Sequence, residues 1–405
     1  MKPFSLVVAL VVAVSFPCPG APPKTTTLSK PEEPAAAPVW KRLNAEVTTP
    51  LFIKQAAGIN TLANVTLSAT AIPLNGEVAK VIFTSDLGAG GNAVIASVTK
   101  LLKSVHHGWP AGHRVEIAFN PPVAPDDAPA SALAIALILD SMIAGWEADP
   151  ACSIVGGLRD DGKVFAATSA LMRLTTATRS AASRIIMPEK NATEAADCMV
   201  NEGVAGTGRV QMFAVKDFDE VLRMAAATPD PDMTTAMETF AEVQKSLSQA
   251  DSDPEALLKE SDVLESLRSV LEKWQNHMSA RLLLGHARGL YKTFSLPGSM
   301  EAVDRIAATL LKGISAARPY EIKGLPSDQI DAEVAKLRAA APRLDPKARP
   351  YVEAVLRYGD AARTWNARPN HTAFELEDFM TTMSTEAGKA RDRRGDVAAL
   401  ISAQK

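Results

Sequence analysis

Polar and apolar positions alternate with a period of two in one stretch near the start of the chain, and an apolar run follows it. Val65, Leu67 and Ala69 alternate with threonine and serine, and a second apolar run at 78–84 follows the dipeptide Asn75-Gly76. This alternation is typical of strands, and Asn-Gly supplies the positive φ angles of a tight hairpin turn. We therefore predict that the two stretches pair as a β-hairpin.

The segments up to residue 228 continue as alternating helices and strands. Residues 131–144 are apolar on nearly every side, which predicts a buried helix. The remaining expected elements are helices at 91–105, at 169–182 and from Asp217, and strands at 115–119, 152–156, 184–187 and 210–215. This pattern predicts one α/β (α+β) domain over residues 48–228.

The chain changes character after the Pro- and Asp-rich stretch at 228–233. Helical periodicity then recurs with proline or glycine at the boundaries, and without a fixed repeat length. The expected helices are at about 234–249, 255–274, 276–292, 297–313, 327–341, 346–365 and 372–391. We predict an all-α helical domain over residues 229–405, built as a bundle.

The N-terminus carries a targeting pattern. Lys2 precedes an apolar run at 4–16, and small residues follow as far as Ala21. A single positive charge, about a dozen apolar residues and a small-residue site indicate a secretory signal peptide over 1–21, and hence an exported, periplasmic or secreted protein. An uncleaved anchor is the alternative, although a membrane span needs about 20 apolar residues. Residues 22–47, rich in Pro, Ala and Thr, are predicted to be a linker.

Composition and motifs exclude several classes of function. The formal net charge is −3, aromatic residues make up 5%, and no long basic run occurs, so we expect no nucleic-acid partner. No Gly-x-x-x-x-Gly-Lys-Ser/Thr loop is found, so we expect no ATP binding. We predict no cofactor and no metal, because the histidines near 106–113 lack a completing ligand set. Cys152 and Cys198 could pair or remain two buried thiols.

The turn at 125–131 is the strongest candidate for chemistry. Ser131 lies where a loop enters the buried helix, and free N–H groups at such a junction can hold an oxyanion. A serine needs a neighbouring base to act as a nucleophile, and the more ordinary role here is to cap the helix N–H groups. Asp126 and Asp127 could form an acid–base pair, but exposed turn carboxylates are the commoner explanation.

Three segments in order give the α/β region a resemblance to a known family. Asp-Ala-Pro-Ala-Ser-Ala at 127–132 resembles Asp-Gly-Pro-Ser-Ala-Gly around the nucleophile of Lon proteases, which are serine–lysine peptidases. Val155-Gly156, followed by Gly162, is similar to the family's Thr-Gly-Glu…Gly turn. Residues 164–188 are similar to its Val-Leu-Pro-Ile-Gly-Gly-Leu-Lys…Leu-Ile-Pro stretch. The resemblance covers less than half of the chain and implies the Lon proteolytic fold.

The residues that would carry the family's chemistry are replaced here. Ala130 occupies the position of the serine, Leu171 that of the lysine, and Val155 that of the threonine that supports the lysine. Leucine cannot accept a proton, and the nearest basic residue, Arg173, remains protonated and cannot act as a base. The resemblance therefore implies a catalytic dyad that is not intact, with Ser131 as the fallback nucleophile.

The frame around these positions is retained. Asp127, Pro129, Val155 and Gly156 keep the family's shape and are our candidate binding residues. We expect an exported pseudopeptidase that binds peptides, unfolded segments or partner proteins by strand addition in the family's groove. The alternatives are an active ATP-independent serine endopeptidase that uses Ser131, and a purely structural envelope protein. Because the family forms rings, a homo-oligomer is also expected.

Overall fold

The computed structural model describes residues 37–54, 60–74, 80–249, 253–321, 326–368 and 370–403, and residues 37–405 form one compact unit. The predicted signal peptide and residues 22–36 of the predicted linker lie outside the described residues. The end of that linker was placed too late. Residues 44–47 belong to the first strand, β1 (Asn44–Lys54), which the adjoining Pro- and Ala-rich composition concealed.

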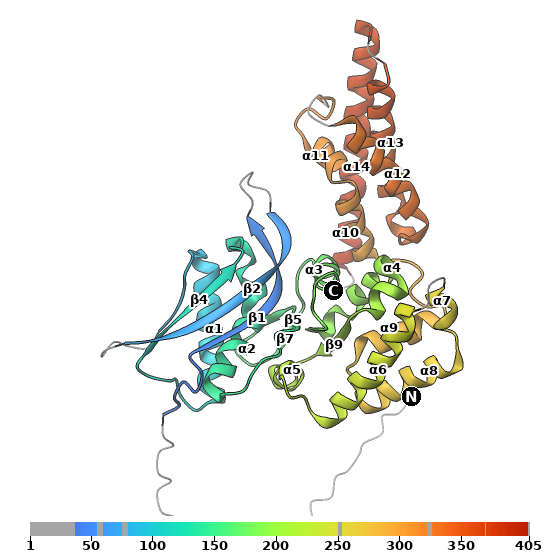
Figure 1. Ribbon diagram of the computed structural model, residues 1–405. Coiled ribbons are helices and arrows are strands. Elements are labelled where there is room, and N and C mark those ends of the chain that lie inside the picture. The colour runs from blue at the N-terminus through green and yellow to red at the C-terminus, as the bar shows by residue number, and fades with distance from the viewer. Residues whose placement is uncertain are drawn as a thin grey trace, which may run out of the picture. The chain divides into compact units, whose positions relative to one another are not determined.

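The described strands form one seven-stranded mixed sheet and a small two-stranded sheet (Figure 1). The order in the large sheet is β3-β4-β2-β1-β5-β8-β9. Its members are β1, β2 (Asn60–Pro73), β3 (Lys80–Phe83), β4 (His113–Asn120), β5 (Cys152–Ile154), β8 (Arg184–Pro188) and β9 (Gln211–Val215). The small sheet pairs β6 (Gly157–Leu158) with β7 (Val164–Phe165).

The predicted hairpin between 65–71 and 78–84 is wrong. β4 lies between β2 and β3, and β3 runs parallel to β4. β2 instead pairs antiparallel along the whole of β1, with Val47 opposite Leu67. The Asn75-Gly76 turn lies outside the described residues. Period-two alternation predicted the strands correctly but not their partner, because pairing depends on side-chain contacts that the local sequence does not contain.

Helices cover both faces of the sheet. The helices of the α/β region are α1 (Gly88–Val105), α2 (Ala132–Ala144), α3 (Ala170–Thr178), α4 (Ala192–Gly208) and α5 (Phe218–Ala225), with short 3₁₀ turns η1 (Pro125–Ser131) and η2 (Glu189–Asn191). Alternate residues of β8 enter different cores: Ile186 packs with α1 and α2, whereas Ile185 and Met187 pack with α3 and α4. A strand buried on both faces has a continuous apolar run, as β8 has at residues 185–187.

Helix α2 is the centre of the first core. Twelve of its thirteen residues are buried, which confirms the prediction of a buried helix. Together with η1 it is long and apolar enough to cross a membrane, but 83% of that apolar window is buried inside the protein. Its apolar composition is accounted for by its position between α1 and the sheet.

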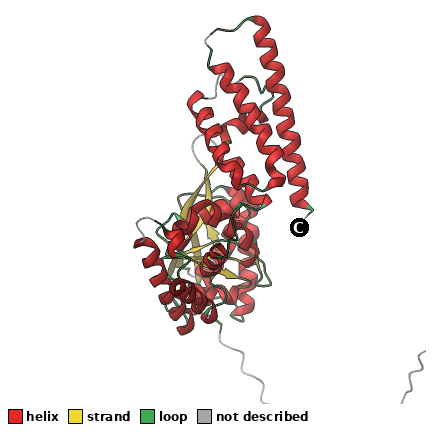
Figure 2. Ribbon diagram, turned by 90° about the vertical axis from the view of Figure 1, so that its right-hand side faces the viewer, coloured by secondary structure: helices red, strands yellow, loops and turns green. Residues whose placement is uncertain are grey.

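The C-terminal region is helical, as expected. Its helices are α6 (Pro231–Gln249), α7 (Pro254–Leu257), α8 (Ser261–Lys273), α9 (Met278–Ala287), α10 (Leu296–Ile306), α11 (Ala308–Ser315), α12 (Ser327–Ala340), α13 (Arg349–Asn366) and α14 (Ala373–Ser402), with 3₁₀ turns η4 (Ala341–Arg343) and η5 (Pro346–Ala348). Two of the predicted helices are each divided, at 258–260 and at Ala307. Figure 2 shows long helices side by side in this region.

The hydrophobic core continues from the sheet into the helical region. One buried cluster contains Leu171 and Met212 together with Leu310 and Tyr351. Residues 276–279 also lie along the outer edge of β9, where the Ala214 N–H donates to the Asn276 carbonyl at 3.0 Å. The α/β and helical regions therefore support each other by packing and by backbone hydrogen bonds.

Candidate functional site

The turn η1 presents the segment that sequence analysis singled out. Pro129 is exposed, Ala130 is half-buried, and Ser131 is fully buried. Ser131 is the N-cap residue of α2, as predicted, but its side chain does not cap a helix N–H. Its hydroxyl instead donates to the Ala128 carbonyl at 2.7 Å. The predicted capping bond is therefore wrong, because the preceding 3₁₀ turn brings a carbonyl closer than any free N–H.

The other two positions of the predicted site are apolar and enclosed. Leu171 and Val155 are each 1% exposed and lie in the same hydrophobic cluster. Leu171 is the second residue of α3, and the Val155 N–H donates to the Ile186 carbonyl at 2.8 Å. Gly156 has a φ of +126°, and a side chain there would approach Pro188 to 2.7 Å, so a larger residue would be strained. None of these groups can donate or accept a proton during catalysis.

A buried ion pair joins the two halves of this site. Arg173, 1% exposed, donates to both carboxylate oxygens of Asp127, at 2.5 and 3.0 Å. Asp127 is 8% exposed, so the interpretation of this residue as an exposed turn carboxylate is wrong. Two parallel N–H···O⁻ bonds are the strong arrangement for an arginine and a carboxylate. Sequence reasoning considered both residues but did not pair them, because they are distant in sequence.

The same pair binds the backbone of β1. The Phe52 N–H donates to Asp127 Oδ2 at 2.7 Å, and Arg173 donates to the Pro50 carbonyl at 2.7 Å. The Phe52 carbonyl accepts a hydrogen bond from the Ala124 N–H at 2.7 Å. Arg173 Nε also donates to the Thr168 carbonyl at 2.8 Å. C-terminal to its pairing with β5, β1 therefore already has hydrogen-bond partners in this chain for the backbone groups of Pro50 and Phe52.

A second buried polar residue fixes the approach to α3. Asn191 is 1% exposed; its side-chain oxygen accepts from the Ala167 N–H at 2.8 Å, and its amide donates to the Ala167 carbonyl. Ser169, the N-cap of α3, adopts a left-handed φ of 51°. The order of strand, turn and helix agrees with the arrangement that the sequence resemblance implied, and Asn191 fixes the loop before α3.

Residues 60–228 match the Lon protease (S16) C-terminal proteolytic domain. No curated protein matches the chain. The match covers less than half of the chain, begins after β1 and ends before the helices of the C-terminal region. The α/β region is therefore a Lon-type proteolytic domain, and β1, whose backbone the Asp127–Arg173 pair holds, lies outside the matched segment.

The remaining reactive side chains do not add a catalytic group to the Lon-type domain. Cys152 and Cys198 are both buried free thiols, and burial raises the pKa of each to about 12, so neither is ionised near neutral pH. His106, near the N-terminal end of the histidine-containing loop, bonds the buried Asp140 at 2.7 Å rather than a metal set. Within the described ranges, no group of three His, Cys, Asp or Glu side chains could hold a metal ion.

Acidic side chains from α4 and α10 lie close to the start of α3. Burial and, to a smaller extent, the negative charge of Glu194 raise the pKa of Glu301 to about 7, against a hydrogen bond from the Met172 backbone. Burial also raises the pKa of Asp197 to about 6, although Ser295 donates two hydrogen bonds to it at 2.6 Å. Glu301 accepts from the Met172 backbone, one residue after Leu171, but neither carboxyl forms a hydrogen bond with Ser131.

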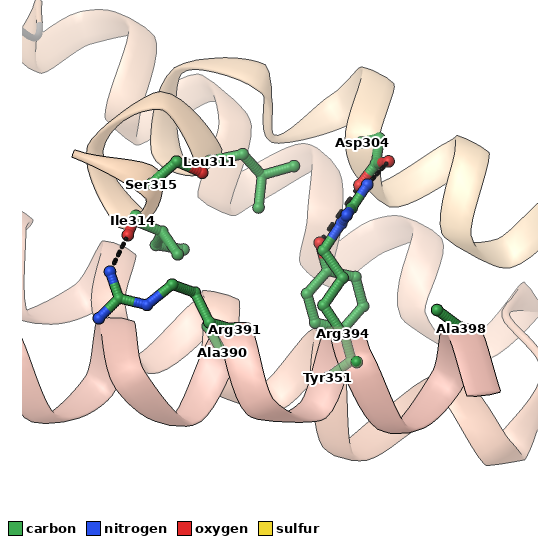
Figure 3. A pocket seen from close by; sticks show the side chains of 10 residues that line it. Asp304, Leu311, Ile314, Ser315, Tyr351, Ala390, Arg391, Arg394 and Ala398 are labelled. Atoms are coloured by element: carbon green, nitrogen blue, oxygen red, sulfur yellow. Dashed lines mark hydrogen bonds and ion pairs between the residues drawn. The ribbon is translucent and has the colours of Figure 1, made fainter. Parts of the chain in front are cut away.

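A cavity with charged lining in the helical region is separate from this site. It has a volume of about 500 Å³ and lies between α10, α11, α13 and α14. In Figure 3, Arg394 reaches Asp304 and Arg391 reaches the Ile314 carbonyl, at 2.8 and 2.9 Å. Tyr351 also donates to Asp304 at 3.2 Å. These contacts join the four helices and assign no chemistry to the cavity.

Proposed function

We propose that this chain is an exported Lon-type pseudopeptidase that binds peptide segments or partner proteins without cleaving them. The single observation that carries the proposal is the pair of apolar residues at the dyad positions, Ala130 and Leu171. Alanine has no nucleophile, and leucine has no lone pair to receive a proton. Export rests on the N-terminal sequence pattern alone.

The environment of Ser131 supports the loss of activity. Its hydroxyl is fully buried and donates to Ala128, a carbonyl that cannot serve as a base at neutral pH. Activation requires a base within hydrogen-bond reach of the nucleophile. Arg173 is held by two carbonyls and a carboxylate, so it remains a structural cation. The use of Ser131 as a substitute nucleophile would require η1 to unwind.

The binding half of the proposal follows from what is retained. A complete sheet with covered faces persists although the dyad is absent, and such a scaffold can present an edge to an extended chain. The backbone of β1 beside the candidate residue Asp127 is not open to an added strand, because Phe52 and Pro50 already have partners. We therefore expect the binding surface to lie elsewhere on the domain.

An assay with unfolded casein tests this proposal. The purified chain without residues 1–21 is incubated with fluorescein-labelled casein, with and without ATP, beside a Ser131→Ala variant. We expect no release of acid-soluble fluorescence, and retention of casein in a pull-down. Cleavage that Ser131→Ala abolishes would establish the alternative of an active serine endopeptidase. Absence of both cleavage and binding would favour a purely structural protein.

The assembly state is measured in the same preparation. The resemblance to a ring-forming family leads us to propose a homo-oligomer, which sedimentation velocity detects as a species several times the mass of the chain. A single monomeric species over a wide concentration range would contradict this part of the proposal without affecting the pseudopeptidase assignment.

A further inference from the structure

Three stretches of backbone at the margins of the large sheet could accept an added strand. The outer edge of β9 is covered by residues 276–279, through the Ala214–Asn276 hydrogen bond and a bond from the Met212 N–H to Ser279 Oγ at 2.8 Å. The part of β1 beyond β5 is occupied by Asp127, Arg173 and Ala124, as described above. The remaining margin is β3.

β3 is the last strand on its side of the sheet and has a free edge. The Thr84 N–H donates to the Ile117 carbonyl of β4, which fixes the direction of the neighbouring backbone groups. Because these directions alternate along a strand, the N–H and C=O groups of Val81 and Phe83 point away from β4. Among the described residues, none forms a hydrogen bond with these outward groups.

Two adjoining cavities run along this edge between β3 and α1. Their volumes are about 530 and 320 Å³, and Val81, Asn92 and Ile95 line both of them. Lys80 and Trp109 also line the larger cavity. An extended chain added to β3 would place alternate side chains against this apolar surface, which is how strand addition obtains specificity.

The charge of the larger cavity selects the kind of chain that fits. Lys80, Lys100 and Lys103 line it, and its lining contains no aspartate or glutamate. Lys100 is paired with Asp160 at 2.5 Å, whereas Lys80 and Lys103 form no ion pair with the described residues. Thr99 contributes a buried hydroxyl oxygen with no hydrogen-bond partner among the described residues. The surface therefore offers two free cations and an unused polar group beside a free strand edge.

We propose that the free edge of β3 binds an extended peptide segment with acidic side chains, which adds to the sheet as a further strand. The backbone of the segment pairs with Val81 and Phe83, its apolar side chains enter the groove beside Ile95 and Trp109, and its carboxylates face Lys80 and Lys103. This inference rests on the proposed binding function and gives it a location and a ligand class.

The probe is the fluorescein-labelled heptapeptide Glu-Val-Glu-Val-Glu-Val-Glu, with binding followed by fluorescence anisotropy. The Lys-Val-Lys-Val-Lys-Val-Lys peptide tests charge, and the acidic peptide N-methylated at alternate residues tests strand addition without any change to the protein. We expect only the unmodified acidic peptide to bind, with an affinity that falls as salt rises. Equal binding of the N-methylated peptide would overturn strand addition, and equal binding of the lysine peptide would overturn the charge argument.

The location is tested by a double charge reversal with a matched control. The Lys80→Glu/Lys103→Glu variant should bind the acidic peptide about tenfold more weakly or worse, since unfavourable charges replace favourable ones. The Lys245→Glu/Lys259→Glu variant makes the same change at exposed positions on and beside other helices and should bind as wild type does. Unchanged affinity of the first variant, or no binding of the acidic peptide to wild type, would overturn the proposal.

The failure of this inference is distinguishable from failure of the proposed function. If wild type retains casein without cleavage, and the Lys80→Glu/Lys103→Glu variant retains it equally, the pseudopeptidase assignment stands and the β3 site is wrong. If wild type cleaves casein, the proposed function fails first.

Discussion

Arg173 on α3 donates both ends of its guanidinium to Asp127 in η1, and in sequence the two residues flank the positions where a Lon-type dyad would be. Arg173 is two residues beyond Leu171, and Asp127 is three residues before Ala130. The pair also holds β1 through Phe52, whose ring lies 5.3 Å from the guanidinium carbon. The two residues therefore connect η1, α3 and β1 through buried hydrogen bonds.

Replacing Arg173 with methionine should strongly destabilise the protein. The substitution leaves the Asp127 carboxylate and the Pro50 and Thr168 carbonyls without their donor in a buried site. Removing one partner of a buried pair costs about 3–5 kcal/mol. The free energy of unfolding from urea titration measures the loss. Arg338→Met removes an exposed pair with Asp360 and should cost less than about 1 kcal/mol. Equal losses in the two variants would contradict a special role for Arg173.

Restoring a lysine at position 171 should destabilise the domain rather than activate it. Leu171 is 1% exposed in an apolar cluster, so the charged form of a lysine there would lose its hydration. Leu171→Lys should therefore cost several kcal/mol at pH 7.

The pH dependence distinguishes charge burial from poor packing. Burial depresses the folded pKa of the lysine below its unfolded value of about 10.4. The destabilisation is complete below the folded pKa and is lost as pH rises towards the unfolded pKa. Urea titrations of Leu171→Lys and of the size-matched Leu171→Met at pH 7 and 10 measure this. A Leu171→Lys loss that does not shrink at pH 10 would contradict the charge argument.

Local patterns predicted the elements of the fold better than their contacts. The buried helix over 131–144 and the strands near 115–119, 184–187 and 210–215 were correct, because their apolar periods depend only on nearby residues. The hairpin between 65–71 and 78–84 was wrong because β4, which begins thirty residues after the end of β3, pairs with both strands and lies between them. A sequence typical of a tight turn predicts a reversal of the chain, but it does not determine which strands become neighbours in the sheet.

Part of the candidate site was predicted from the sequence, and part of it was missed. Ala130, Leu171 and Val155 were placed by their spacing from glycines and prolines, and the structure describes each in an apolar environment. The Asp127–Arg173 pair was missed because nothing in a local sequence reveals that two charges will be desolvated together. An aspartate in a turn and an arginine on a helix ordinarily face water.

His277 should make the protein lose stability in acid. Its ring is fully buried against Phe213 and Phe240, and burial lowers its pKa to about 3. The unfolded chain binds a proton below the usual value of 6.5, whereas the folded chain does not, so stability falls as pH drops from 6.5 towards 3. His277→Asn removes this term, so unfolding measured at pH 6.5, 5.5 and 4.5 should show a slope shallower by up to about 1.4 kcal/mol per pH unit. His107→Asn, at an exposed loop position, is the control and should keep the wild-type slope.

Glu301 should have the opposite effect at higher pH. Burial raises its folded pKa to about 7 from the usual 4.5, so the folded chain retains a proton that the unfolded chain has lost. Stability therefore falls as pH rises from 4.5 to 7 and does not change further through this group above pH 7.

Glu301→Gln keeps the size of the side chain and removes the charge. It should match wild type near pH 4 and be more stable by about 3 kcal/mol at pH 8. The exposed substitution Glu238→Gln should change stability little at either pH. Urea titrations at pH 4, 6 and 8 provide the measurement, and a Glu301→Gln variant that gains no stability at pH 8 would show that the folded-state pKa of Glu301 is not raised above its usual value.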